Sequence, residues 1–438
     1  MHRSATIPFS RVPAKVAIIG GGVSALTAAL AVAAEGRSIV LFEKRGGRPH
    51  KPSAQDFFCH AVLAGGTDAF ERLCPGILAD IVDGGGQLCD SLHDVRYVED
   101  RACTPRQRSG YAMLLAPRPL IEDKLRERVV KLAGVSFERA KIADILPRAD
   151  GRLSVVGGSG GTFDAVIDAS GSEHQWPGLQ GVELGSDRLE QPVGIEMVSA
   201  HFSLPVCPER RSGLLVFNAP PPQGKLGGQL MICGPERGQL SLGWRGTRRN
   251  VRELPLWDTF AAFAPDVAVE MALGWRQSSE VQTYRFREAY YHRAAGPERL
   301  GVPYFPVGDA QLKTNPAFGL GTSLAAISCL KLRNVFSARP AYDPVEAARR
   351  YAFACRGHLD TAWSLTTTTD GLYDRPEQVR GLGRAMLNFM LGRLRARFIG
   401  SPALARRVIL SAQLVVHDRP WFDPRFAVPA GCASMPTK

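Results

Sequence analysis

Two short apolar runs near the start of the chain frame a turn made of glycines. Residues 16–19 (Val-Ala-Ile-Ile) and 39–42 (Ile-Val-Leu-Phe) are continuous and rich in β-branched residues, which predicts strands buried on both faces of a parallel sheet. Residues 26–34 between them are small and apolar, and they predict a helix. The order strand, glycine triplet, helix, strand is that of a βαβ unit, and it ends at Glu43.

The period of the hydrophobic pattern changes along the rest of the chain. Alternation within residues 194–244 predicts a block of antiparallel strands and hence a second lobe. A glycine cluster at residues 157–161 lies between two strand patterns, so it predicts a hairpin rather than a second nucleotide loop. Apolar residues at helical spacing predict helices over residues 67–82, 119–132, 254–273, 321–335 and much of 344–412.

Composition and charge narrow the classes of partner. Of the 438 residues 45% are hydrophobic, which suits a large core in two or three lobes. The formal charge is +12, but the basic residues are scattered and form no stripe interleaved with aromatics, which argues against nucleic acid. An anionic substrate, an acidic partner or a membrane surface remains open.

Cysteines and apolar runs bear on the compartment. The nine cysteines are odd in number and form no C-x-x-C, which is typical of buried thiols in a reducing compartment. No His/Cys/Asp cluster has metal-ligand spacing, so no metal is expected. Residues 1–14 lack the apolar core of a signal peptide and no apolar run reaches about 18 residues, so we expect a cytoplasmic chain without a spanning helix.

The first glycine turn carries the features of a dinucleotide-binding fingerprint. Gly20 permits the tight turn, Gly22 lets a pyrophosphate approach the backbone, and Ala25 lets the helix pack close to the strand. The free N–H groups of the helix start then face the anion. Glu43 follows near the spacing of about 20 residues expected for an acid that binds a ribose hydroxyl. A glycine-rich turn in another kind of α/β unit is the alternative.

A second turn of this kind lies far downstream. Residues 302–307 predict a strand that leads into Gly308 and Asp309, and residues 315–323 form a glycine-rich turn that opens a helix. The acid at the strand end is in reach of sugar hydroxyls, and the helix start can face the negative charge of a reduced flavin. Taken alone, this motif is equally consistent with an ordinary capped helix start. Together the two motifs predict FAD.

These motifs resemble those of the FAD-dependent monooxygenases that share the hydroxybenzoate-hydroxylase fold. Within them the chain is most similar to the squalene-epoxidase-like bacterial branch that includes polyether epoxidases. The resemblance spans about residues 15–374, and its Asn-Pro and Gly-x-Gly turn is the most specific part. The matching stretches are residues 16–25 with Glu43, 55–66, 117–122, 164–171, 308–309 with 315–322, and 359–363.

The resemblance implies an α/β fold in which a Rossmann-like FAD-binding domain of the glutathione-reductase type is interleaved with an antiparallel β-sheet substrate domain. C-terminal helices follow. After a leader at residues 1–14, the expected FAD-binding domain comprises residues 15–82, 116–184 and 295–336. The expected substrate domain comprises residues 83–115 and 185–294, and the helical region 337–438. An amphipathic stretch at 386–395 predicts a helix packed on the FAD lobe, with an interfacial membrane helix as the alternative.

The resemblance also implies roles for single residues. Glu43 would hold the adenosine ribose, Asp309 the ribitol chain, and Arg118 would approach the flavin side, unless Arg118 is only a surface arginine at a helix start. The expected cofactor-binding set is Gly20, Gly22, Ser24, Ala25, Glu43, Lys44, Arg118, Ile142, Gly171, Asp309, Gly319, Leu320, Gly321 and Thr322. The candidates for the substrate pocket are Tyr111, Trp244, Tyr284, Pro316 and Phe318.

The implied chemistry is oxygenation through a flavin C4a-hydroperoxide, with O2 as co-substrate, so no catalytic side chain is expected. Phe57 and Phe58 stand where the branch often has Arg and His, and Phe318 and Leu320 where it usually has Tyr and Gln, which makes the flavin surroundings less polar. Because only one complete fingerprint is present, either NAD(P)H visits the flavin transiently or a separate flavin reductase supplies reduced flavin. Three histidines are interpreted as structural or pocket-edge residues: His60, His174 and His292.

The expected reaction is epoxidation or hydroxylation of a lipophilic or aromatic small molecule in secondary-metabolite biosynthesis. A flavin-dependent halogenase is an alternative, although halogenases of this fold usually carry W-x-W-x-I-P and no two of the six tryptophans here are two positions apart. A flavin dehydrogenase or reductase of an isoprenoid is another. A FAD-binding protein without turnover is the alternative outside enzymes.

Overall fold

A computed structural model describes the chain over residues 13–45, 54–99, 102–171, 176–179, 186–205, 213–219, 224–233, 236–246, 253, 255–263, 274–294, 296–338, 343–373 and 400–416. Its first sheet has five parallel strands in the order β19-β12-β1-β2-β8. These are β1 (Lys15–Ile19), β2 (Ser38–Glu43), β8 (Val135–Arg139), β12 (Ala165–Asp168) and β19 (Tyr304–Pro306). The central strand β1 is covered on both faces, which explains its unbroken apolar run.

The register of this sheet determines where the site can form. Ile19 lies beside Phe42 on one side and Asp168 on the other, and Asp168 lies beside Pro306. The carboxyl ends of these four strands therefore meet at one edge. In open parallel sheets that edge is where ligands bind.

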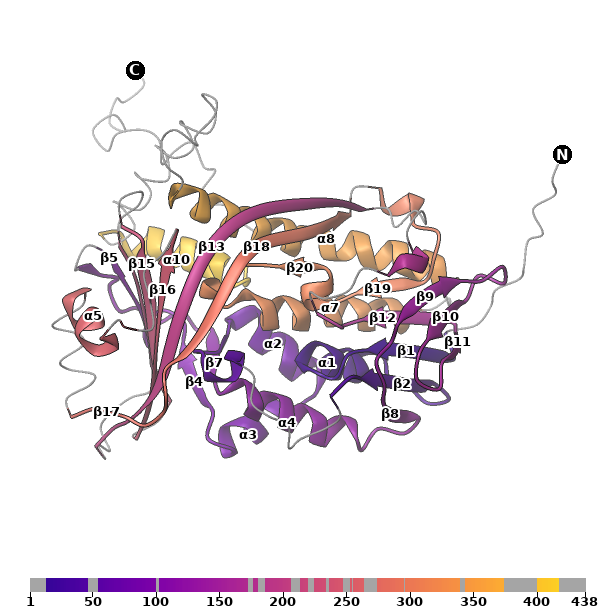
Figure 1. Cartoon of the computed structure of the whole chain (residues 1–438), viewed down its shortest axis with the longest axis horizontal. Coiled ribbons are helices and arrows are strands. Elements are labelled where there is room, and N and C mark those ends of the chain that lie inside the picture. The colour runs from indigo at the N-terminus through magenta and orange to yellow at the C-terminus, as the bar shows by residue number, and fades with distance from the viewer. Residues whose placement is uncertain are drawn as a thin grey trace, which may run out of the picture.

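Helices cover the parallel sheet and join it to the rest of the molecule (Figure 1). Helix α7 (Leu320–Phe336) packs against α1 (Val23–Val32), α2 (Ala64–Leu73) and α8 (Pro344–Asp370), and α4 (Arg118–Val129) packs against α1. The helical pattern of residues 67–82 is divided between α2 and α3 (Ile77–Asp83), because Gly76 between them takes a left-handed conformation with φ of 83°.

A nine-stranded, mostly antiparallel sheet forms the other lobe. It follows the order β20-β18-β13-β16-β15-β14-β5-β6, with β17 beside β13. Strands β13 and β18 are long and run from this lobe toward the parallel sheet (Figure 1). The strands are β5 (Val95–Glu99), β6 (Ala102–Cys103), β13 (Ser186–Ser203), β14 (Gly213–Asn218), β15 (Leu226–Ile232), β16 (Arg237–Arg245), β17 (Arg276–Gln277), β18 (Gln282–Ala294) and β20 (Leu312–Lys313).

The two faces of this sheet differ in chemistry. On one face Val198, Leu240 and Leu242 form a core with Phe260 of α5 (Leu256–Phe263). The opposite face turns toward the short 3-10 helix Ala54–Phe57 and its neighbours, where Gln239 donates to the carbonyl of Phe57. Alternation along the strands separates the two sets, as period-2 geometry requires.

Two smaller sheets complete the strand inventory of the described residues. The predicted hairpin around the glycine cluster is confirmed, because β10 (Leu153–Val156) pairs antiparallel with β11 (Gly161–Phe163) and with β9 (Asp144–Pro147). Strand β7 (Ala112–Leu115) lies between β3 (Ala61–Val62) and β4 (Gln87–Asp90).

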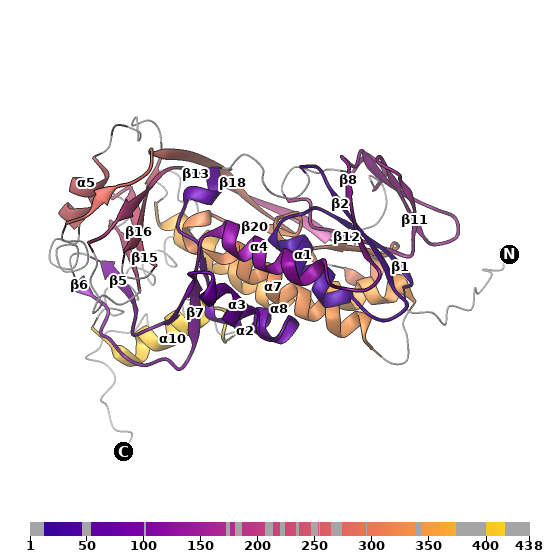
Figure 2. The same ribbon diagram turned by 90° about the horizontal axis from the view of Figure 1, so that it is seen from below.

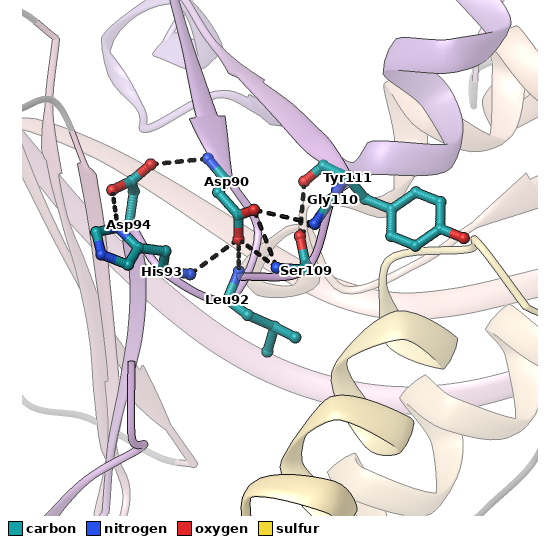
Figure 3. Close-up of polar contacts among 7 residues, drawn as sticks. All are labelled: Asp90, Leu92, His93, Asp94, Ser109, Gly110 and Tyr111. Carbon is teal, nitrogen blue, oxygen red and sulfur yellow. Dashed lines mark hydrogen bonds and ion pairs between the residues drawn. The ribbon is translucent and has the colours of Figure 1, made fainter. Parts of the chain in front are cut away.

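The loop after β4 is held by one carboxylate (Figure 3). The Asp90 carboxylate accepts hydrogen bonds from the backbone N–H groups of Leu92, His93, Ser109 and Gly110. Burial alone would raise the pKa of Asp90, but these donors outweigh burial and lower it. Tyr111 points away from this carboxylate (Figure 3).

The C-terminal part of the described chain is tied to the start of α2, and α10 (Pro402–Ala412) lies beside it in Figure 2. Gln413 accepts hydrogen bonds from Ala64 N through its side chain (2.9 Å) and from Gly65 N through its carbonyl (2.9 Å). The amphipathic stretch 386–395 lies outside the described residues. None of the helices within the described ranges is long and apolar enough to cross a membrane.

Candidate functional site

Three consecutive glycines after β1 are each required for a different reason. Gly20 has φ of +129°, and a Cβ there would collide with the carbonyl oxygen of Ala169. At Gly21 a Cβ would collide with the carboxylate of Glu43. At Gly22, in contrast, a Cβ would meet only Arg118 Nη2, at 3.6 Å, so the open space there is available to a ligand.

Two helix starts at the site have no side-chain cap. Gly22 is the N-cap of α1 and Gly319 that of α7. Among the described residues no side chain accepts a hydrogen bond from either helix start, and neither first turn carries an acid. Helices α8 and α10 differ, because Asp343 and Ser401 cap their starts. The N–H groups and positive dipole ends of α1 and α7 therefore remain available to anions.

The two sequence motifs are in direct contact. Gly308 has φ of +66°, and a Cβ there would lie 2.5 Å from Ser24 Oγ in the first turn of α1. Asp309 follows, and among the described residues its carboxylate forms no hydrogen bond. Burial raises the pKa of Asp309, and the positive charges of Lys313 and Arg118 oppose this rise. A partly buried acceptor without a partner suits a ligand hydroxyl.

The turn before α7 combines a fixed backbone with an open side. Asn315 is fully buried, and its Oδ1 accepts a hydrogen bond from Ala317 N at 3.1 Å. Gly319 lies in the left-handed region with φ of 64°. A Cβ at Gly321 would have only Asp309 Oδ1 nearby, at 3.8 Å. Gly319 is therefore needed for its backbone, while Gly321 leaves room for a ligand.

Arg126 belongs to this site, although the sequence analysis did not single it out. Its Nη2 lies 2.7 Å from Glu43 Oε2 and donates to Gly21 O at 3.1 Å, and its Nη1 donates to Glu43 Oε1 at 3.3 Å. The guanidinium also lies 4.9 Å from the centroid of the Phe137 ring. Each carboxylate oxygen of Glu43 keeps a lone pair for a further donor. Arg126 lies on a helix 83 residues away from Glu43, so no sequence pattern around either residue could predict the pair.

Arg118 and His60 border the same space. Arg118 reaches from the first turn of α4 toward Gly22 and donates to Gln55 Oε1. Burial, together with the charge of Arg118, lowers the pKa of His60 to about 4. His60 is therefore neutral at pH 7, consistent with a structural residue at the edge of the site rather than a proton donor.

The other expected cofactor residues occupy varied positions. Ala25 is fully buried where α1 meets the sheet, Ile142 is 5% exposed and Leu320 is 1% exposed. Gly171 has φ of +90° with no atom within 4 Å of an added Cβ. Lys44 is exposed and Thr322 is half-buried.

The candidate substrate residues lie in different surroundings. Tyr284 packs beside Phe58, with ring centroids 6.0 Å apart, and the charges of Asp309 and Arg118 act on its hydroxyl. Pro316 and Phe318 lie on the turn before α7. Trp244 packs instead on the opposite face of the large sheet, with the α5 core, and Tyr111 is 42% exposed at the start of β7.

The histidines, cysteines and possible metal ligands are described only in part. His174 lies outside these ranges, and the burial of His292 lowers its pKa. The described cysteines are all free thiols. No group of His, Cys, Asp and Glu with metal-binding geometry occurs among the residues that the structure describes.

The fold is that of flavin-dependent monooxygenases and halogenases. PqsL of Pseudomonas aeruginosa in complex with 2-aminobenzoylacetate has a TM-score of 0.66 at 18% identity, covering 82% of this chain and 96% of that one. The flavin-dependent brominase Bmp2 has a TM-score of 0.63 at 15% identity, with 94% and 96% covered. For 2-methyl-3-hydroxypyridine-5-carboxylic acid oxygenase the TM-score is 0.60 at 16% identity, with 85% and 96% covered.

At the level of sequence the similarities are sparser. No protein-family model matches the chain. Protein Rv3254 of Mycobacterium tuberculosis is 25% identical over 365 residues, which are 74% of this chain and 73% of that protein. The α/β fold with a Rossmann-like parallel sheet, an antiparallel second sheet and C-terminal helices is confirmed by the structural similarities. The narrower resemblance to the epoxidase-like branch stays a prediction.

Proposed function

We propose that this chain is a FAD-dependent monooxygenase that epoxidises or hydroxylates a lipophilic or aromatic small molecule in a biosynthetic pathway. The observation that carries the proposal is the contact between Ser24 and Gly308. Within the described part of the chain, it joins two helix starts without side-chain caps and an acid, Asp309, whose carboxylate has no hydrogen-bond partner. The two helix starts suit a pyrophosphate and an anionic ring edge, and the acid suits sugar hydroxyls.

Different residues of the chain would bind different parts of the cofactor. The α1 start at Gly22 would hold the pyrophosphate, with Arg118 beside it, and Glu43 would hold the adenosine ribose. Asp309 would bind the ribitol, and the α7 start would face the negative edge of the reduced ring. When bound, the flavin supplies the activation of O2. The protein positions the substrate and excludes water.

The surroundings of the turn before α7 favour an apolar substrate. Phe318 is half-buried on this turn. Phe58 packs with Tyr284, Ile195 and Met197 on the face of the large sheet that turns toward the 3-10 helix Ala54–Phe57. An apolar wall on this side protects a reactive oxygen species from water. Electrons come from NAD(P)H directly or from a separate flavin reductase.

The first experiment tests the cofactor. Gly22→Val should fold, because its Cβ faces open space, yet lose bound FAD as measured by absorbance of the purified protein. Gly301→Val is the control, since Gly301 also faces open space but precedes the amino end of β19, at the opposite end of that strand from Gly308 and Asp309. Equal FAD content in the two variants would contradict the assignment of the first turn.

The second experiment tests turnover. We expect substrate-dependent consumption of O2 with NAD(P)H or a reductase, and Phe318→Ala should release more hydrogen peroxide per reductant oxidised. FAD binding without any O2 consumption over a panel of apolar substrates would favour a dehydrogenase, a reductase or a FAD-binding protein without turnover.

A flavin-dependent halogenase is the second candidate, because the brominase Bmp2 matches nearly the whole fold. Product formation that requires chloride or bromide would favour it. Oxygenated product formed equally well without halide would favour the monooxygenase.

A further inference from the structure

A buried carboxylate joins the turn before α7 (residues 315–319) to the large sheet. Asp370 is the last residue of α8, and its side chain is 3% exposed. Its Oδ1 accepts hydrogen bonds from Asn315 Nδ2, at 2.9 Å, and from Arg245 Nη1 of strand β16. The Arg245 guanidinium also lies 4.4 Å from the centroid of the Tyr373 ring. Helix α8, the turn before α7 and strand β16 therefore meet at Asp370 Oδ1.

This carboxylate sets the orientation of the Asn315 amide. An ionised carboxylate only accepts hydrogen bonds, so the Nδ2 end of Asn315 must face Asp370. The Oδ1 end then faces Ala317 N, which it caps at 3.1 Å. Because Asn315 is fully buried, no water competes for either end.

The same turn is attached to the sheet at a second point. Gln229 Nε2 on β15 donates to Ala317 O at 2.6 Å. Strands β15 and β16 are neighbours in register, with Gln229 opposite Ser241 and Leu226 opposite Trp244. A shift of these two strands therefore acts on the turn through both Gln229 and the pair formed by Arg245 and Asp370.

We propose that Asp370 is a positioning residue for the bound flavin, which couples the substrate-facing sheet to the turn before α7. This inference rests on the proposed function. Asp370 acts through Asn315, which fixes the conformation of the turn that ends at Gly319. This turn sets the direction of the N–H groups at the start of α7. The α7 start in turn determines how well the negative edge of the reduced ring is stabilised.

The test uses Asp370→Asn in the FAD-loaded full chain, with Asp360→Asn as the matched control. Asp360 lies on the same helix and pairs with Arg293 of β18 at 3.1 Å and with Arg356, and none of its hydrogen bonds or ion pairs within the described residues reaches the turn before α7. We expect Asp370→Asn to shift the midpoint potential of the flavin and to slow flavin reduction about 10-fold or more, as small misplacements do. Asp360→Asn should lower the melting temperature only.

A second variant keeps the proposal testable if Asp370→Asn folds poorly. Asn315→Ala should give the same change in potential, and the double variant should add little, because both residues act on one turn. An unchanged potential and reduction rate in both single variants, with FAD bound, would overturn the positioning role. A wild-type chain that binds no FAD would overturn the proposed function instead, which is a separate outcome.

Discussion

Some single residues at the site are held in place by a second residue that the sequence motifs do not include. The pair of Glu43 with Arg126 is an example, because two charges are buried where one ribose is expected to bind. Side-chain exposures of 8% for Glu43 and 19% for Arg126 leave little water to replace a lost partner. The pair therefore holds the acid in place before any ligand arrives.

Arg126→Gln should destabilise the FAD-free protein by about 3 kcal/mol, because it leaves the Glu43 carboxylate buried without its charged partner. The free energy of unfolding in urea measures this effect. Arg128→Gln is the control on the same helix, since its pair with Asp80 is about one-third exposed on each side and should contribute about 0–1 kcal/mol. Adding Glu43→Gln to Arg126→Gln should recover part of the loss, and additive losses would contradict the coupling.

His60 should make stability depend on pH below neutrality. Its folded pKa of about 4 lies below the ordinary value of 6.5, so the unfolded chain binds more protons between these two values. Above pH 6.5 the His60 ring is neutral in both the folded and the unfolded state, so it costs no stability. As the pH falls from 6.5 toward 4, the unfolded chain takes up the proton first and the free energy of unfolding decreases. We expect a loss of about 1–2 kcal/mol from pH 7 to pH 5, discounted because the ring is only half-buried. His60→Gln should flatten this part of the urea-unfolding profile, and an unchanged slope would exclude His60 as its source.

At the scale of whole elements, helix ends show how distant parts of the chain complete each other. The start of α2 has no side-chain cap of its own. Gln413 supplies the missing acceptors, and it is 1% exposed. A Cβ at Gly65 would collide with the Leu414 carbonyl, so this contact also requires a glycine.

Gln413→Ala should lower the free energy of unfolding by about 1–3 kcal/mol, because it leaves the buried N–H of Ala64 without an acceptor. Thermal unfolding measures the total loss, and hydrogen exchange should locate it in the first turn of α2. Gln107→Ala is the control: it removes an exposed side-chain hydrogen bond to Pro402 O of α10 and should change little. Equal effects of the two variants would contradict a specific cap.

Patterns within one element predicted structure well, and contacts between elements were not predictable. The βαβ unit, the hairpin after the glycine cluster and α4 follow from local periodicity and turn residues. The lengths of β13 and β18 do not, because Pro192 and Gly194 interrupt the pattern while the strand continues through a register shift. The sheet face on which Trp244 lies depends on its register with β13 and β15, which alternation alone does not specify.

At the scale of the whole molecule, the long strands β13 and β18 make the two lobes one unit. Both reach from the large sheet toward the parallel sheet, and β20 beside β18 directly follows the Gly308–Ala310 turn (Figure 1). A ligand bound at the edge of the parallel sheet therefore stabilises both lobes.

FAD at 100 times its dissociation constant should stabilise the protein by about 2.7 kcal/mol and raise the temperature of one unfolding transition. Differential scanning calorimetry with and without FAD measures this shift. Gly22→Val should show the same single transition without the shift. Two transitions, of which only one responds to FAD, would contradict the coupling of the lobes.

The cap that Gln413 provides has a consequence for how the protein is made. Ala64 and its acceptor are 349 residues apart, so a growing chain on the ribosome exposes the start of α2 long before its cap is synthesised. Strand β19 and helix α7, which complete the parallel sheet and cover α2, also come late in the chain. The lobe that contains the parallel sheet therefore cannot be completed in the order of its synthesis. Its first half must wait, partly exposed to chaperones and proteases, until nearly all of the described chain has emerged.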